Sequence, residues 1–166
     1  MRRPAAAVIL IISILMAGPA IAGPYEDATK AYFSGDYEAA YRLIKPMAEK
    51  GLPEAQFNLG LMYNNGQGVP QDYAEAVTWY RKAAEQGNAK GQYSLGMMFY
   101  RGRGVPKDYV LAHMWLNLAT SRYPALEKAK REWAEIFRDI AASKMTPAQL
   151  AEAKKLAKEW KPKQEK

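Results

Sequence analysis

Two eight-residue stretches of the chain, GQGVPQDY at 66–73 and GRGVPKDY at 102–109, differ at only two positions. Asp72 in the first stretch corresponds to Asp108 in the second, so the offset between the stretches is 36 residues. A fixed internal period of this length indicates a tandem-repeat fold, in which each unit is a small supersecondary structure that packs on its neighbours. This period restricts the possible folds more than the composition of the chain does.

The similarity continues on both sides of the two stretches, because residues 53–88 align with residues 89–124. Apolar residues recur at helical spacing before and after each stretch, as Leu59 and Met62 do before the first one. Each unit is therefore expected to be a pair of helices, which we call A and B. The chain is predicted to be all-α, an α-α solenoid of antiparallel helix pairs with capping helices at its C-terminal end.

The repeated loop has the residue types that a turn between two helices requires. Gly66 is expected to end helix A in the left-handed conformation, and Pro70 moves Val69 out of the helical region. Asp72 is expected to cap helix B, with Glu75 completing a capping box.

Glycine also recurs inside helix A, as Gly60 and Gly96. Glycine inside a helix destabilises it by about 0.5 to 1 kcal/mol relative to alanine. These two positions therefore indicate that a neighbouring helix approaches closely.

The N-terminal segment has the pattern of a cleaved secretory signal. Residues 1–3 are basic, residues 5–16 are apolar apart from Ser13, and residues 20–22 offer small residues for a signal peptidase. A membrane anchor is the alternative, but the apolar run is shorter than the ~20 residues that span a bilayer. We expect cleavage after Ala22 and a periplasmic or secreted location.

The expected organisation follows from these patterns. It comprises a signal peptide at 1–22, helical repeats at 23–124 and C-terminal capping helices at 125–166. Within the repeats, 23–52 is a degenerate first unit, and 53–88 and 89–124 are full units.

The tail is predicted to cover the open end of the solenoid. One helix has an apolar stripe of Leu126, Ala129, Trp133, Ile136, Phe137 and Ile140. Thr146 and Gln149 are predicted to form a capping box at the start of a second helix, with Pro147 at its first position. The lysine-rich end of this helix leaves contact with a membrane surface as an alternative role for the tail.

Composition excludes several classes of function. The formal net charge is +7, with 24 Lys and Arg against 17 Asp and Glu, and most of the excess lies in 125–166. A basic face for nucleic acid is therefore not expected. The chain has no cysteine and one histidine, so we predict no catalytic residues, no metal site and no cofactor. His113 aligns with Val77 and is expected to be a packing residue, as are Trp79 and Trp115.

The stretch AQFNLGLMYNNGQGVPQDYAEAVTWYRKAAEQG at 55–87 resembles the Sel1-like repeat (SLR) family, a relative of the tetratricopeptide repeat with a longer loop between its helices. The copy GQYSLGMMFYRGRGVPKDYVLAHMWLNLA at 91–119 is similar to it as far as Trp115. An earlier unit containing AYFSGDYEAA has a shortened loop. The resemblance implies an adaptor or scaffold for protein-protein interaction, with the A helices along a concave groove.

The expected binding residues lie on the face of helix A opposite its predicted packing face. They are Glu54, Asn58, Leu61 and Asn65 in the first full unit and Lys90, Ser94, Met97 and Arg101 in the second. An ordinary solvent-facing stripe would have the same pattern. The expected partner is a protein or peptide, and the alternative is a cell-wall or glycan-associated binding protein that regulates an envelope hydrolase.

Overall fold

The computed structural model describes residues 19–163. This part of the chain folds into eight α-helices and one short 3-10 helix, without strands. They are α1 (Pro19–Ser34), α2 (Tyr37–Glu49), α3 (Pro53–Asn65), α4 (Tyr73–Glu85), α5 (Ala89–Arg101), α6 (Tyr109–Arg122), η2 (Ala125–Glu127), α7 (Lys128–Ala142) and α8 (Pro147–Glu159).

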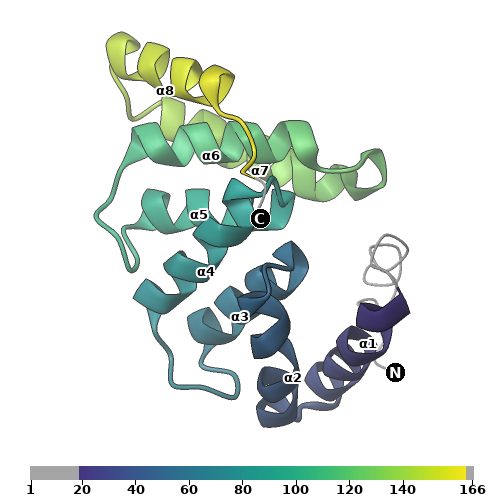
Figure 1. Ribbon diagram of the computed structural model, residues 1–166. Helices are drawn as coiled ribbons and strands as arrows, with labels where there is room; N and C mark the ends of the chain where they lie inside the picture. Colours follow the sequence, from purple (N-terminus) through teal and green to yellow (C-terminus); the bar gives the residue numbers. More distant parts are fainter. Residues whose placement is uncertain (1–18, 164–166) are drawn as a thin grey trace, which may run out of the picture.

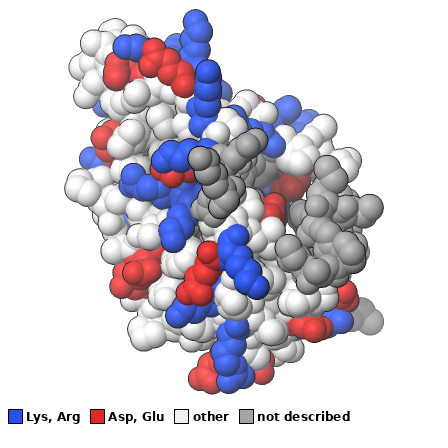
Figure 2. Space-filling view, in the orientation of Figure 1, with Lys and Arg blue, Asp and Glu red and all other residues white. Residues whose placement is uncertain are grey.

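The helices stack in chain order, from α1 and α2 at one end of the molecule to α7 and α8 at the other (Figure 1). Each of the first six helices packs on the next one along the chain, and α8 packs against α6. The predicted all-α solenoid of helix pairs is confirmed. On the face shown in Figure 2, Lys and Arg side chains are interleaved with Asp and Glu.

Residues 1–18 of the predicted signal peptide, which spans 1–22, lie outside the described residues. Helix α1 begins at Pro19 and continues through the expected cleavage point between Ala22 and Gly23. Within residues 19–163, no helix is both long and apolar enough to cross a bilayer.

The repeated loops have the expected backbone. Gly66 ends α3 with φ 65°, and Gly102 ends α5 with φ 67°, both in the left-handed region. The Asp72 carboxylate accepts hydrogen bonds from the amides of Ala74 and Glu75 at 2.9 and 3.0 Å. Asp72 is therefore the N-cap of α4.

The expected capping box at Asp72 does not form. The amide of Asp72, which Glu75 was expected to engage, donates instead to the carbonyl oxygen of Tyr63 at 3.0 Å. This bond fastens the end of the loop to the last turn of α3, and it leaves the Glu75 carboxylate exposed.

The second glycine of each loop fixes how the units stack. A Cβ atom at Gly68 would overlap the carbonyl oxygen of Tyr37, and one at Gly104 would overlap the carbonyl oxygen of Tyr73. Tyr37 and Tyr73 are the first residues of the B helices of the preceding units. Each loop therefore lies directly on the start of the B helix before it.

The glycines inside the A helices have the predicted role. A Cβ at Gly60 would lie 2.7 Å from the ring of Tyr80, and one at Gly96 would lie 2.9 Å from Leu116. The helices α3 and α4, and likewise α5 and α6, are therefore so close together that a side chain at Gly60 or Gly96 would not fit between them.

Two buried glutamines join consecutive units. The amide of Gln56 donates to the Ala48 carbonyl at 3.2 Å, and that of Gln92 donates to the Ala84 carbonyl at 3.1 Å. In each case the A helix adds a second donor to a carbonyl near the C-terminal end of the preceding B helix, beside the backbone amide of Gly51 or Gly87.

The predicted packing residues are buried. Trp79 and Trp115 are 9% and 7% exposed, and His113 is 4% exposed. Burial and the positive charges of Arg138 and Lys154 lower the pKa of His113, so the imidazole is neutral near pH 7.

The capping helices agree only in part with the expectation. The capping box of Thr146 and Gln149 is present at the start of α8. The apolar stripe of the tail was expected to be covered, but Leu126 in η2 and Trp133, Ile136 and Ile140 in α7 are exposed. Helix α7 instead packs through a neighbouring face on which the small residues Ala134 and Ala141 are buried, because small side chains let α6 approach closely.

Candidate peptide-binding groove

Two adjoining pockets lie along the A helices. The first, of about 190 Å³, lies between α1 and α3, and the second, of about 420 Å³, lies between α3, α5 and α7. Both are lined by Phe57 and Lys90, so the two pockets adjoin at these residues, and we refer to them together as the A-helix groove. This A-helix groove is lined by Tyr25, Thr29, Tyr32, Phe33, Ile44, Glu54, Phe57, Asn58, Leu61, Asn88, Lys90, Tyr93, Ser94, Tyr123, Lys130 and Trp133.

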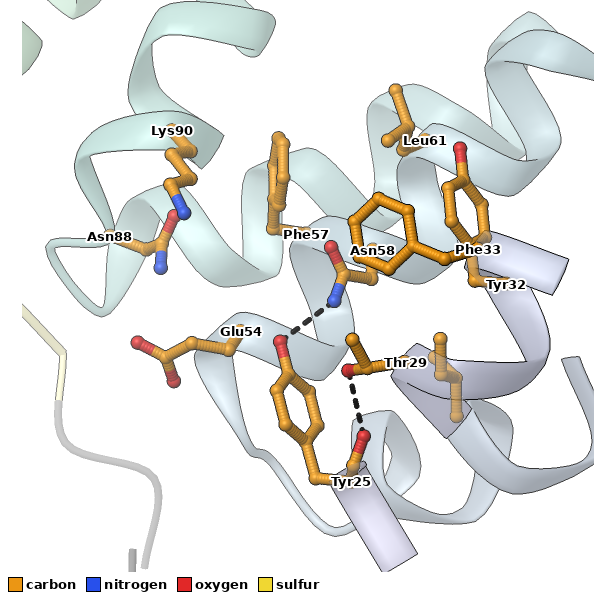
Figure 3. A pocket seen from close by; sticks show the side chains of 11 residues that line it. Tyr25, Thr29, Tyr32, Phe33, Glu54, Phe57, Asn58, Leu61, Asn88 and Lys90 are labelled. Carbon is orange, nitrogen blue, oxygen red and sulfur yellow. Dashed lines mark hydrogen bonds between the residues drawn. The ribbon is translucent and has the colours of Figure 1, made fainter. Parts of the chain in front are cut away.

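The side chain of Tyr25 is fixed at the base of the first pocket (Figure 3). Its hydroxyl accepts a hydrogen bond from the Asn58 amide at 2.8 Å, and its carbonyl accepts one from the Thr29 hydroxyl at 2.8 Å. Burial, aided by the negative charge of Glu54, raises the pKa of Tyr25 to about 12. The tyrosine is thus neutral and joins α1 to α3.

Polar and apolar groups lie at different ends of this pocket. Figure 3 shows Glu54, Asn88 and Lys90 at one end and Phe33 and Leu61 at the other. The side-chain oxygen Oδ1 of Asn88 accepts a hydrogen bond from the backbone amide of Gly91 at 2.8 Å, and this bond caps the start of α5. Asn88 is therefore held by the backbone, whereas no hydrogen bond or ion pair holds Lys90 to another described residue.

Burial, followed by repulsion from Lys130, lowers the pKa of Lys90, and Glu127 and Glu54 oppose this change. Lys130 itself forms an ion pair with Glu127. Lys90 is therefore a partly dehydrated cation between the two pockets.

Aromatic rings line the second pocket and continue onto α7. Trp133 stacks on Phe137 with ring centroids 6.1 Å apart, and Phe137 meets the edge of Tyr93 at 6.5 Å. Trp133 is nevertheless 56% exposed. Much of the Trp133 ring thus remains accessible to a bound molecule.

The structure brings five of the eight predicted binding residues together in the A-helix groove. These are Glu54, Asn58, Leu61, Lys90 and Ser94. Asn65 and Arg101 are exposed at the loop ends of α3 and α5 and line neither pocket.

Met97 differs from the expectation, because its side chain is only 6% exposed. Helix α5 packs against α4, α6 and α7, whereas α3 packs chiefly against α2 and α4. A position that is partly accessible on α3, at Leu61, is therefore covered on α5. Met97 belongs to the core and not to the accessible groove.

The aromatic lining was missed by the sequence interpretation. Phe57 and Tyr93 occupy equivalent positions in the two full units, and both are only half-buried and line the groove. Their recurrence outside the predicted packing face was the signal that could have identified them. Tyr25 and Trp133 lie outside the two full units, so the repeat could not have identified them.

Among the residues that the structure describes, no group of three His, Asp or Glu side chains could hold a metal ion. The groove instead combines aromatic rings, amides and a few charged groups. This arrangement is suited to non-covalent recognition of a partner.

Stacked helix pairs with a hollow along the A helices define an α-α repeat protein. The Sel1 repeat family model matches residues 53–88 and 89–122, which correspond to the two full units. The chain is a Sel1-like repeat protein, with a fold that generally mediates protein-protein interactions and is typically non-catalytic.

Solved structures share this fold. The chain is similar to c5321, a protective antigen of uropathogenic Escherichia coli with an SLR fold, with a TM-score of 0.76 and 33% identity. The match covers 86% of this chain and 30% of that one. A Sel1 repeat protein from Oxalobacter formigenes has a TM-score of 0.58 and 33% identity, covering 64% of this chain and 43% of that one.

The curated relatives match only locally. DAP3-binding cell death enhancer 1 of Rattus norvegicus is 41% identical over 44 residues, which are 26% of this chain and 9% of that protein. The chain thus matches about a tenth of the length of such relatives, and the similarity concerns the repeats alone.

Proposed function

We propose that the protein is an exported adaptor or scaffold that holds a segment of a partner protein in the A-helix groove. The observation that supports this most directly is that the two pockets adjoin at Phe57 and Lys90. A hollow that extends over α1, α3, α5 and α7 suits an extended peptide better than a compact small molecule.

The composition of the groove agrees with this role. Rigid aromatic side chains such as Phe33, Phe57 and Trp133 offer large contact areas with little conformational entropy to lose. Amide and charged groups between them provide direction and specificity. Sel1 repeat proteins typically bind proteins, which favours a polypeptide partner over a glycan.

Export is the part of the proposal that rests on the sequence of residues 1–22 alone. We expect the protein isolated from the cell envelope or from the medium to begin at Gly23. Intact-mass measurement of this material tests the expectation, and a mass that includes Met1 would contradict it.

The binding role is tested by photo-crosslinking in cells. A photoreactive residue is placed at Leu61 in the groove and, as a matched control, at the exposed Thr78 on α4. We expect a discrete polypeptide to be crosslinked from position 61 and not from position 78. Mass spectrometry of the product then identifies the partner segment.

Two outcomes would contradict the proposal. Equal crosslinking from both positions would show that the groove is not the binding surface. A product that contains glycan and no polypeptide would favour the alternative of a cell-wall-associated binding protein.

A further inference from the structure

Lys90 is the charged side chain at the centre of the A-helix groove. It lines both pockets together with Phe57. The first pocket extends from it toward Phe33 and Leu61, and the second extends toward Trp133. A segment that follows the groove must therefore pass Lys90 between two apolar contacts.

The structure gives this cation no partner among the described residues. Glu127, one of the nearby acids, is engaged by Lys130. Glu54 lies at the same end of the first pocket, but it forms no ion pair with Lys90. The positive charge is thus left to be neutralised by something that enters the groove.

The environment of Lys90 disfavours an unpaired cation in two ways. Its side chain is partly removed from water, which raises the free energy of a charged group without a partner. It also lies in the first turn of α5, where the helix dipole favours negative charge. A bound anion would relieve the first effect and would itself be stabilised by the second.

We infer that the groove selects polypeptide segments in which one acidic side chain lies between apolar or aromatic residues, with its carboxylate paired to Lys90. This inference rests on the proposed function of the groove. A C-terminal carboxylate has the same chemistry, but a pocket lies on each side of Lys90, so an internal Asp or Glu with neighbours on both sides fits it better. The apolar neighbours of the acidic residue occupy the two pockets.

The test is selection from a library of displayed random peptides that are flanked by constant sequence at both ends. The purified protein is used as the target, and the selected peptides are sequenced. We expect one position to be enriched in Asp or Glu, with apolar or aromatic residues on both sides.

Charge reversal provides the specific control. Lys90→Glu should shift the preference at that position from Asp and Glu to Lys and Arg. Lys107→Glu makes the same charge change on an exposed loop outside the groove, and it should leave the preference unchanged. Circular dichroism verifies that both variants fold. If Lys90→Glu does not fold, Lys90→Gln is used in its place, and this variant should remove the preference for an acidic residue.

A selected peptide then gives the size of the effect. Replacing its acidic residue with the corresponding amide should weaken binding to the wild-type protein by roughly tenfold or more. The same peptide pair should bind Lys90→Gln with nearly equal affinity. A large difference that persists in Lys90→Gln would overturn the assignment to Lys90.

The outcomes separate this inference from the proposed function. Selected peptides that compete for Leu61 crosslinking but lack an acidic position would overturn the inference and leave the groove as a peptide site. Failure to select any peptide would count against both. A parallel library displays peptides with free C-termini. If binding requires the free C-terminus, the group that pairs with Lys90 is a terminal carboxylate, and the inference of an internal acidic residue is overturned.

Discussion

Gly104 illustrates how one missing side chain determines the stacking of two units. Its φ is 69°, and a Cβ would overlap backbone atoms of Tyr73 in the preceding unit. Both the left-handed conformation and the close approach therefore require glycine. Gly68 has the same relation to Tyr37, so the recurrence of this glycine reflects a contact between units.

Gly104→Ala is expected to destabilise the protein by more than the ~1 kcal/mol that left-handed backbone costs an L-residue. Gly35→Ala is the matched control, because Gly35 has φ 86° and open space where a Cβ would lie. The difference between the two variants in urea unfolding measures the contact between units. Equal losses of stability would show that the overlap is relieved by small shifts.

His113 is the chain's one histidine, so its titration can be isolated. Its pKa is lowered by burial and by the charges of Arg138 and Lys154, while Asp139 opposes them. In the unfolded chain it binds a proton near pH 6.5, whereas in the folded chain it does so only at lower pH. Folding stability should therefore decrease as the pH falls from 7 to 5.

His113→Val should remove this decrease, because valine occupies the equivalent position at Val77 and does not titrate. Each unit of pKa difference between the folded and unfolded chains corresponds to about 1.4 kcal/mol. Urea unfolding of both proteins at pH 7 and pH 5 measures the effect. A variant with the same pH dependence as the wild type would contradict this role of His113.

At the scale of the elements, the N-cap of α4 depends on Asp72 and not on a reciprocal pair with Glu75. Asp72→Ala should lower the free energy of unfolding by about 1 kcal/mol, since two amides lose their acceptor. Glu75→Ala should have a smaller effect, because its carboxylate acts only through the helix dipole. Thermal or urea unfolding of both variants distinguishes the cap from a capping box, which would make the two losses similar.

The helices could be predicted from the sequence because the apolar period and the loop residues recur together. Leu59 and its repeat Leu95 are buried, and Gly66 ends α3 as expected. The contacts between units could not be predicted in the same way. The bonds of Gln56 and Gln92 to the preceding B helices depend on how one unit is placed on another, which a period within the chain does not specify.

The tail shows the same limit. Its apolar stripe correctly indicated a helix, but α7 packs on α6 through Ala134 and Ala141 and leaves Trp133 exposed. The sequence interpretation takes the apolar stripe as the packing face. In the structure α7 packs on α6 through the small residues beside this stripe, because they let the two helices approach closely. The prediction of the groove fails at Met97 for a similar reason, because this residue was predicted to line the groove and is buried in the structure.

At the scale of the whole molecule, the two capping helices have different contacts. Helix α8 closes the end of the solenoid, where the Trp160 ring meets the edge of Trp115 at 6.2 Å and lies 4.3 Å from the Arg122 guanidinium. After α8, the amide of Lys163 donates to the Glu85 carbonyl at 2.7 Å. Helix α7 instead contributes Trp133 to the A-helix groove.

The two tryptophans should therefore separate stability from binding. Trp160→Ala removes the contacts with Trp115 and Arg122 and should lower the free energy of unfolding by about 2 kcal/mol, less than for a fully buried tryptophan. Trp133→Ala removes a ring that is 56% exposed and stacks on Phe137, and it should lower the free energy of unfolding by less than Trp160→Ala does. Yet it should reduce crosslinking of the partner from position 61, because the second pocket loses its aromatic side. Urea unfolding and crosslinking of both variants measure the two effects, and a Trp133→Ala protein that retains full crosslinking would confine binding to the pocket between α1 and α3.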